Sequence, residues 1–235
     1  MRLPPLAILA GGLATRLRPL TQDVPKSLLE AGGEPFIFHQ LRLLKGSGLD
    51  RIVILAGYLG EMIEQVVGDG SILGLQVEYA YDGEKLLGTA GAVRQALSKL
   101  GPEFFLLYGD SYLPCDYRRV YEAFKSQGQP ALMTVYRNQG RFDTSNVEFA
   151  SGHIVAYDKV RLNPRMAHID YGLGLFARKC FLDLPADEPR DLAQVYQDLL
   201  ARGQLGACEV FERFYEVGSF AGLAEFQAFI TQGGS

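Results

Sequence analysis

Short apolar stretches with strand character alternate with stretches of helical spacing over more than half of the chain. The strand-like stretches are residues 6–10, 51–56, 75–81, 104–108 and 131–136, and the helical ones are 36–45, 59–67, 89–100 and 117–126. A repeated β-then-α order favours a mainly parallel sheet with helices packed on both of its faces. The sequence therefore predicts an α/β fold, a three-layer α/β/α sandwich with a mainly parallel, mixed central sheet.

The remaining third of the chain has a different pattern. Residues 146–149, 154–158 and 169–176 are strand-like, and Ser151-Gly152 is a turn signal between the first two. Residues 191–202 and 220–231 have helical spacing, and Asp191 is suited to cap the first of these helices. No Pro- or Ser-rich linker separates the two patterns, which favours a single domain over residues 1–235.

Composition excludes several classes of protein. Hydrophobic residues make up 48% of the chain and charged residues 21%, the balance of a soluble globular protein. No apolar run approaches the roughly 20 residues that span a bilayer. The apolar residues 3–10 run into Gly11-Gly12 and then into arginines, an order unlike that of a secretory signal peptide. We therefore expect a cytoplasmic protein with no membrane association.

The ionisable residues also limit the possible partners. The three cysteines and three histidines are dispersed, with no spacing typical of a zinc site or a redox motif. The formal net charge of −4 argues against a general nucleic-acid-binding surface. Any phosphate-binding site must therefore be built from local residues.

The segment from residue 9 to residue 28 is the richest in chemistry. A strand-like stretch ends in Gly11-Gly12, which allows backbone N–H groups to approach a polyphosphate closely. Arg16 can hold two phosphate oxygens at once, and Lys26 provides a compact positive charge. The alternative is an ordinary surface loop with solvated cations. Lys26-Ser27 is not the end of a P-loop, because Pro25 stands where that motif requires glycine.

The same segment, LAGGLATRLRPLTQDVPKSL, resembles the LAGGxGTRLxPLTxxxPKxL pattern of the sugar-1-phosphate nucleotidyltransferase family, with Ala14 in place of a usual glycine. The resemblance continues through residue 230 or so and is greatest to short bacterial guanylyltransferases for mannose or heptose 1-phosphate. It implies a Rossmann-like form of the expected fold. It also implies a nucleotide-binding part at about 1–115 and a sugar-phosphate-binding part at about 116–232.

Later segments resemble further motifs of that family. LGTAGA at 87–92 resembles the turn beside the nucleobase, and GDS at 109–111 resembles the element whose aspartate binds magnesium. The segments at 158–159 and 169–173 resemble sugar-phosphate contacts, and FYEVGS at 214–219 resembles the element with the second metal carboxylate, here Glu216.

These resemblances imply a set of site residues. Catalytic roles are expected for Arg16, Lys26 and Asp110, and magnesium is expected on Asp110 and Glu216. Nucleotide contacts are expected from Leu9, Ala10, Gly11, Gly12, Thr15, Arg16, Gly57, Gly88 and Thr89. Sugar-phosphate contacts are expected from Lys26, Asn146, Asp158, Lys159, Asp170, Tyr171 and Gly172.

The chemistry of the implied reaction places few demands on the protein. A sugar 1-phosphate is already ionised near pH 7, since its second pKa is about 6, so no general base is needed. Positioning and electrostatic stabilisation supply most of the catalysis of phosphoryl transfer. Ligands gather at the carboxyl ends of parallel strands, where Gly11, Gly57 and Asp110 are expected.

Three alternatives stay open. The first is a uridylyltransferase for an amino-sugar 1-phosphate, because the motif pattern is shared. The second is a non-catalytic nucleotide-sugar-binding protein. The third is a glycosyltransferase of related fold, although Asp110-Ser111-Tyr112 lacks the second aspartate of a DxD metal motif. GTP and a mannose- or heptose-type sugar are favoured, and the sequence does not indicate an oligomeric state.

Overall fold

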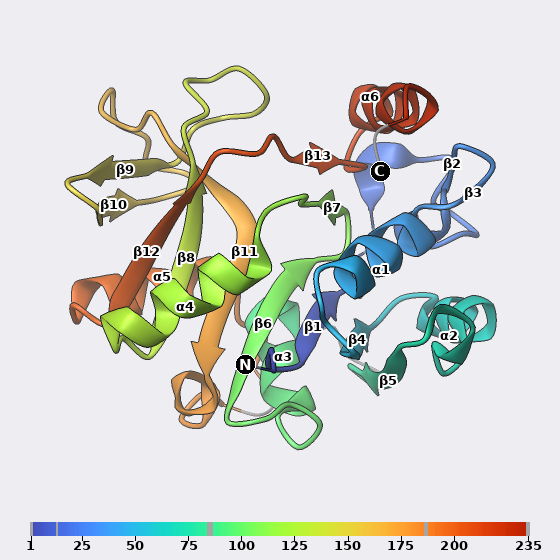
Figure 1. Cartoon of the computed structure of the whole chain (residues 1–235), viewed down its shortest axis with the longest axis horizontal. Helices are drawn as coiled ribbons and strands as arrows, with labels where there is room; N and C mark the ends of the chain where they lie inside the picture. Colours follow the sequence, from blue (N-terminus) through green and yellow to red (C-terminus); the bar gives the residue numbers. More distant parts are fainter. Residues whose placement is uncertain (1, 13, 84–86, 186–187, 234–235) are drawn as a thin grey trace.

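A seven-stranded sheet forms the centre of the molecule (Figure 1). The computed structural model describes residues 2–12, 14–83, 87–185 and 188–233. The strands follow the order β12-β8-β11-β6-β1-β4-β5. Their bounds are Leu6–Leu9 (β1), Arg51–Ala56 (β4), Gln76–Tyr81 (β5), Glu103–Tyr108 (β6), Ala131–Tyr136 (β8), Ile169–Ala177 (β11) and Leu205–Val210 (β12). In this sheet β11 runs antiparallel to both neighbours and the other pairings are parallel, which confirms the mixed, mainly parallel sheet.

Helices cover both faces of the sheet, as the sequence predicts. Their bounds are Phe36–Gly46 (α1), Gly60–Val67 (α2), Gly88–Ala96 (α3), Tyr117–Gln127 (α4), Leu192–Ala201 (α5) and Phe220–Thr231 (α6). The apolar faces of α1, α2 and α4 belong to one core cluster, and those of α3 and α5 belong to the other. Figure 1 shows α1 and α4 in front of the sheet and α3 behind it. Helix α6 packs beside the hairpin of β2 (Glu30–Ala31) and β3 (Glu34–Pro35).

Alternation along the central strands explains the two cores. In β6, Phe105 and Leu107 enter the first core cluster, whereas Phe104 and Leu106 enter the second. Successive side chains of a strand point to opposite faces, so a strand covered on both sides needs apolar residues at nearly every position. The short apolar stretches in the sequence are therefore strands buried on both faces.

The structure adds elements that the sequence pattern does not reveal. Strand β12 forms one edge of the sheet, and its glycine, cysteine and glutamate give it no clear strand signal. Strand β13 (Tyr215–Glu216) pairs antiparallel with β7 (Ser111–Tyr112).

The predicted turn at Ser151-Gly152 joins β9 (Val147–Ala150) to β10 (His153–Tyr157), and both turn residues have positive φ. Short 3₁₀ turns occur at Thr15–Leu17, Lys26–Leu28, Ser71–Leu73 and Arg178–Phe181.

Among the described residues, every helix is too short or too polar to cross a membrane.

Candidate active site

Glycines follow the carboxyl ends of three neighbouring strands of the sheet. Gly11, Gly57 and Gly109 come just after β1, β4 and β6. A Cβ atom on Gly57 would lie 2.8 Å from the carbonyl oxygen of Gly11, and one on Gly109 would lie 2.6 Å from that of Leu9. Such distances exclude a larger residue without movement of the backbone. The strand ends therefore pack closely and leave their backbone groups at the surface of a cavity.

This cavity, of about 260 Å³, is called the glycine-edge cavity below. Its wall includes most of the residues that were expected to contact a nucleotide, namely Leu9, Ala10, Gly11, Gly12, Gly88 and Thr89, together with Lys26 and Asp110. Gly57 lies behind Gly11 and lines a neighbouring hollow instead.

The turn at Gly88-Thr89 is fixed by a loop from the second half of the chain. The amide of Ala90 donates to the carbonyl of Arg190, and the hydroxyl of Thr89 accepts a hydrogen bond of 2.7 Å from the amide of Leu192. Gly88 has φ of +71°, and a Cβ there would lie 2.6 Å from the carbonyl oxygen of Arg190. Glycine is therefore needed both for the conformation and for the close approach.

Asp110 pairs with one cation and has a second in its neighbourhood. The Nζ atom of Lys26 lies 2.5 Å from Oδ2 of Asp110, and their side chains are 22% and 19% exposed, so the ion pair is largely shielded from water. A Cβ on Gly218 would lie 3.3 Å from Nη2 of Arg16 and 3.4 Å from Oδ2 of Asp110, which places both groups beside Gly218.

Glu216 reaches the same place through strand pairing. The β13–β7 pairing sets Glu216 opposite Ser111, and the amide of Val217 donates to the carbonyl of Asp110. Burial, and then the negative charges of Asp110 and Asp143, raise the pKa of Glu216 to about 7, while Lys26 and Arg16 act in the opposite direction. Two carboxylates thus share one enclosed space, which is an arrangement that a cation would stabilise.

The oxygen donors fit magnesium, which prefers carboxylates and keeps several waters or phosphate oxygens as further ligands. Within the described part of the chain, no group of three or more His, Cys, Asp or Glu residues is arranged to hold a metal. A magnesium ion held by Asp110 and Glu216 would therefore need ligands from water or substrate.

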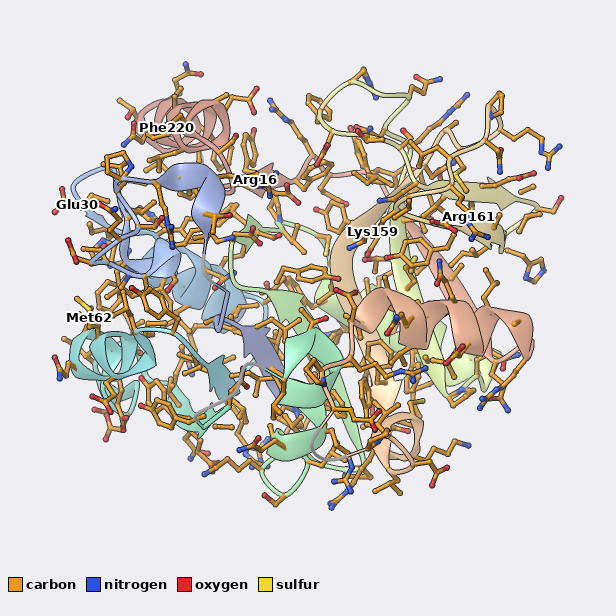
Figure 2. All side chains as sticks on the ribbon, turned by 180° about the vertical axis from the view of Figure 1, so that it is seen from behind. Arg16, Glu30, Met62, Lys159, Arg161 and Phe220 are labelled. Atoms are coloured by element: carbon orange, nitrogen blue, oxygen red, sulfur yellow. The ribbon has the colours of Figure 1, made fainter. Side chains whose placement is uncertain are left out.

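A second cavity of about 370 Å³, called the Lys159 cavity below, adjoins the first. Tyr108 and Asp110 line both cavities. The wall of the Lys159 cavity also includes Arg16, Asn146, Lys159, Asp170, Gly172 and Glu216. Figure 2 shows Arg16 and Lys159, from opposite halves of the chain, both towards the middle of the molecule. Ligand sites commonly occupy about 300–1,000 Å³. The Lys159 cavity falls within that range and the glycine-edge cavity lies slightly below it, so together they leave room for two substrates.

Asp170 lies deep in the wall of the Lys159 cavity. Its carboxylate accepts hydrogen bonds from the amide of Gly172 and the hydroxyl of Tyr157, and lies 4.0 Å from Nζ of Lys159. Burial raises the pKa of Asp170 despite the attraction of Lys159. The side-chain oxygen of Asn146 accepts from the amide of Asp170 and so fixes the strand there.

Besides Gly57, four expected site residues have other places in the structure. Tyr171 points away from the Lys159 cavity and packs, 1% exposed, against Tyr136 and Phe214. Asp158 accepts hydrogen bonds from the amides of Val160 and Arg161 and closes a turn. Thr15 is exposed and lines neither cavity. Arg16 lines the Lys159 cavity rather than the glycine-edge cavity, so it lies on the side expected for the sugar phosphate.

Sequence reasoning missed several lining residues, of which Asp82 and Asp143 carry charge. Asp82 follows β5 directly and lines the glycine-edge cavity. The rule that ligands meet strand ends, already applied to Asp110, could have found it. Asp143 lies in a loop between β8 and β9, in the wall of the Lys159 cavity, and has no comparable local signal.

The family model for nucleotidyl transferases matches residues 6–149, more than half of the chain, and includes the glycine-rich segment, Lys26 and Asp110. The chain belongs to the nucleotidyl transferase family. Two curated relatives extend the similarity of this nucleotidyl transferase over most of its length. The N-acetylmuramate α-1-phosphate uridylyltransferase of Neisseria meningitidis is 29% identical over 94% of the chain and 96% of the relative. The D-glycero-α-D-manno-heptose 1-phosphate guanylyltransferase of Campylobacter jejuni is 24% identical over 90% of the chain and 93% of the relative.

A solved structure shares the fold of this nucleotidyl transferase. The putative glucose-1-phosphate thymidylyltransferase of Bacillus anthracis, crystallised with a sucrose, superimposes with a TM-score of 0.84 over 96% of the chain and 94% of that structure, at 24% identity. This similarity shows the Rossmann-like α/β architecture and supports the expectation for the fold.

Proposed function

We propose that this nucleotidyl transferase joins a nucleoside triphosphate, preferentially GTP, to a sugar 1-phosphate of mannose or heptose type, forming a nucleotide-sugar and pyrophosphate. One observation carries the proposal. Two adjoining cavities share Asp110, and the cations Arg16, Lys26 and Lys159 line them. Two polyanionic substrates could thus meet at a single point where positive charge offsets their repulsion.

The reaction balances without a protein base. A phosphate oxygen of the ionised sugar 1-phosphate attacks the α-phosphorus, and the bond from that phosphorus to the β-phosphate oxygen breaks. Pyrophosphate leaves with the electron pair of the broken bond. Lys26, at the junction of the cavities, would bind oxygens of the α-phosphate, and Lys159 would hold the sugar phosphate. Arg16 lies close enough to Asp110 to stabilise the charge that develops between the substrates.

Asp110 and Glu216 would hold the magnesium ion, which supplies charge neutralisation at the phosphates when bound. Lys26 pairs with Asp110 in the structure and has to share that carboxylate with the ion. The raised pKa of Glu216 is consistent with a position where a cation is needed to keep both carboxylates ionised.

The choice of GTP rests on the resemblance of the turn at 87–92 and on the guanylyltransferase relative. A uridylyltransferase acting on an amino-sugar 1-phosphate is the second candidate, because the uridylyltransferase relative matches nearly the whole of both chains. A non-catalytic sensor of nucleotide-sugars is the third, and the shielded Lys26–Asp110 pair argues for catalysis instead.

A substrate matrix tests the proposal. ATP, CTP, GTP, UTP and dTTP are each combined with mannose, heptose, glucose, N-acetylglucosamine and N-acetylmuramate 1-phosphates, and pyrophosphate release is followed with magnesium present. We expect the highest kcat/KM with GTP and a manno-configured sugar. Higher kcat/KM with UTP and an amino sugar would establish the second candidate, and binding without turnover in every combination would establish the third.

A further inference from the structure

Asp82 closes the glycine-edge cavity at the end opposite to Lys26 and Asp110. Strands β5 and β6, which precede Asp82 and Asp110, are separated in the sheet by β1 and β4. At about 4.8 Å per strand spacing, the two strand ends lie roughly 14 Å apart. Asp110 also lines the Lys159 cavity, whereas Asp82 also lines the hollow beside Gly57. The cavity therefore extends from the phosphate-binding end to Asp82.

The Asp82 carboxylate is held in place by its surroundings. The backbone amide of Asp82 donates to the carbonyl of Ala56, and the side chain of Asp82 accepts a hydrogen bond from the backbone of Leu87. Its Oδ2 atom lies 3.5 Å from where a Cβ on Gly11 would be and 3.3 Å from where one on Gly57 would be. The two glycines thus leave the space that the carboxylate occupies at the strand ends.

Because it is partly buried, the Asp82 carboxylate has lost some of the water molecules that would otherwise donate hydrogen bonds to it. Desolvation raises the pKa of Asp82, and the bond from Leu87 only partly offsets it. An ionised carboxylate is a pure acceptor with room for several donors. A ligand that brings two adjacent N–H groups would therefore be favoured at this end of the cavity.

The five common bases differ at the edge that such a group would meet. Guanine alone presents two adjacent donors, its ring N1–H and its 2-amino group. Uracil and thymine present one N–H between two carbonyl oxygens, which a carboxylate repels. Adenine and cytosine present an amino group beside a ring nitrogen that is itself an acceptor.

We propose that Asp82 is the residue that selects guanine, by accepting hydrogen bonds from N1–H and the 2-amino group of the base. The proposal rests on the nucleotidyl transfer proposed above. Transfer requires the α-phosphate at Lys26 and Asp110, so the base, at the other end of the nucleotide, reaches Asp82. The ribose then lies between them, against the backbone of Leu9 and Ala10, which line the cavity.

The test combines a change in the protein with a change in the base. Asp82→Asn keeps the size of the side chain but replaces one acceptor with a donor. ITP lacks only the 2-amino group of GTP. A good bidentate contact to a base is worth about 1–3 kcal/mol, or roughly 5- to 150-fold in kcat/KM. ITP keeps N1–H and loses one of the two hydrogen bonds, so we expect wild type to prefer GTP to ITP by roughly 5- to 30-fold, the lower part of that range.

In Asp82→Asn the ratio of GTP to ITP should fall towards one, and kcat/KM with UTP or dTTP should rise, because the amide can pair with N3–H and a neighbouring carbonyl. Glu78→Gln is the matched control. Glu78 lies on the same strand, β5, is 45% exposed and pairs with Arg51 and Lys99 at the surface. This variant should keep the wild-type ratios.

The outcomes separate this inference from the proposed function. Pyrophosphate release with any pair of substrates supports nucleotidyl transfer, whatever the base ratios are. A GTP to ITP ratio near one in wild type, which needs no variant, overturns the role of Asp82. So does an equal loss for all five triphosphates in Asp82→Asn, which would mean that Asp82 holds the ribose. If no pair turns over, calorimetric titration of wild type with GTP, ITP and UTP tests base selection alone, and equal affinities overturn it.

Discussion

Single charged residues in this site differ sharply in their electrostatic surroundings. Lys26 faces Asp110 at 2.5 Å, in a place largely shielded from water. Asp170 is almost wholly buried, at 3% side-chain exposure, and its closest cation is 4.0 Å away. The first group can act on transferring charge, whereas the second carries a desolvation cost that the fold must offset. The expected consequences of substitution therefore differ in kind.

Lys26→Ala should lower kcat about 10²- to 10³-fold, since removal of one electrostatic contact to developing charge commonly costs that much. The fold should persist, because Lys26 lies at the cavity wall and not in the core. Steady-state kinetics by pyrophosphate release, with thermal unfolding of the same samples, checks both points. Lys125→Ala is the control, since Lys125 forms a comparable pair with Glu103 at the surface. Near-normal turnover in Lys26→Ala would falsify the assignment.

Asp170→Asn should alter the pH dependence of stability. Because the folded-state pKa of Asp170 is raised, its favourable contribution is complete below the unfolded pKa of about 3.9 and is lost as pH rises through the folded pKa. Asparagine removes this titration. The free energy of unfolding of the variant, measured by urea titration, should therefore improve relative to wild type as pH rises above about 4. A difference that does not change with pH would contradict the prediction. Activity should fall, because Lys159 loses its neighbouring charge.

At the scale of elements, two parts of the chain far apart in sequence define the turn before α3. The loop at 188–192 receives a hydrogen bond from Ala90 and gives one to Thr89. These contacts hold Gly88 against the backbone of Arg190. The turn before α3 is thus supported by the second half of the chain.

Gly88→Ala tests this support, and Gly33→Ala is its matched control. Both glycines have positive φ, but a Cβ on Gly33 meets nothing within 4 Å, whereas one on Gly88 meets the Arg190 carbonyl oxygen at 2.6 Å. Gly33→Ala should lower the free energy of unfolding by about 1–2 kcal/mol, from its backbone conformation alone. Gly88→Ala should cost more and should also raise KM for the triphosphate, as measured by urea unfolding and steady-state kinetics. Equal stability and equal KM for the two variants would show that the contact is unimportant.

At the scale of the whole molecule, the fold brings the middle and the C-terminal part of the chain to one site. Asp110 follows a central strand, and Glu216 comes just before the C-terminal helix α6. The short pairing of β7 and β13 brings the two carboxylates together. Strands from both halves of the chain also share the central sheet, so the two cavities are parts of one structure.

A magnesium titration of turnover tests the carboxylate pair. Glu216→Gln should lower kcat and raise the magnesium concentration needed for half-maximal rate, because one charged ligand is lost. Glu216→Asp should retain part of the activity, and Asp110→Asn should be at least as damaging as Glu216→Gln. Glu212→Gln, at a nearby exposed position, should behave as wild type. Identical magnesium curves for Glu216→Gln and wild type would mean that Asp110 holds the ion without Glu216.

Local patterns in the sequence were sufficient to predict the alternating strands and helices and to locate the glycine-rich segment that follows β1. Strand and helix periodicity depend on neighbouring residues, so residues 51–56 and 131–136 were predicted with the observed bounds. Gly11, Gly57 and Asp110 likewise follow the carboxyl ends of neighbouring parallel strands, where they were expected. The α/β fold and the glycine-rich strand ends that line the glycine-edge cavity could therefore be predicted from the sequence.

Only the tertiary structure decided which side chains face the cavities. Strand alternation sets Tyr171 opposite Asp170 and Gly172, but only the packing of the sheet decides that Asp170 and Gly172 are on the face towards the Lys159 cavity and Tyr171 is in the core. Glu216 reaches Asp110 through a two-residue pairing that has no signal of its own. Asp82 completes the far end of the glycine-edge cavity because β5 lies beside β4. Each of these depends on contacts between residues distant in sequence, which periodicity and motif spacing do not encode.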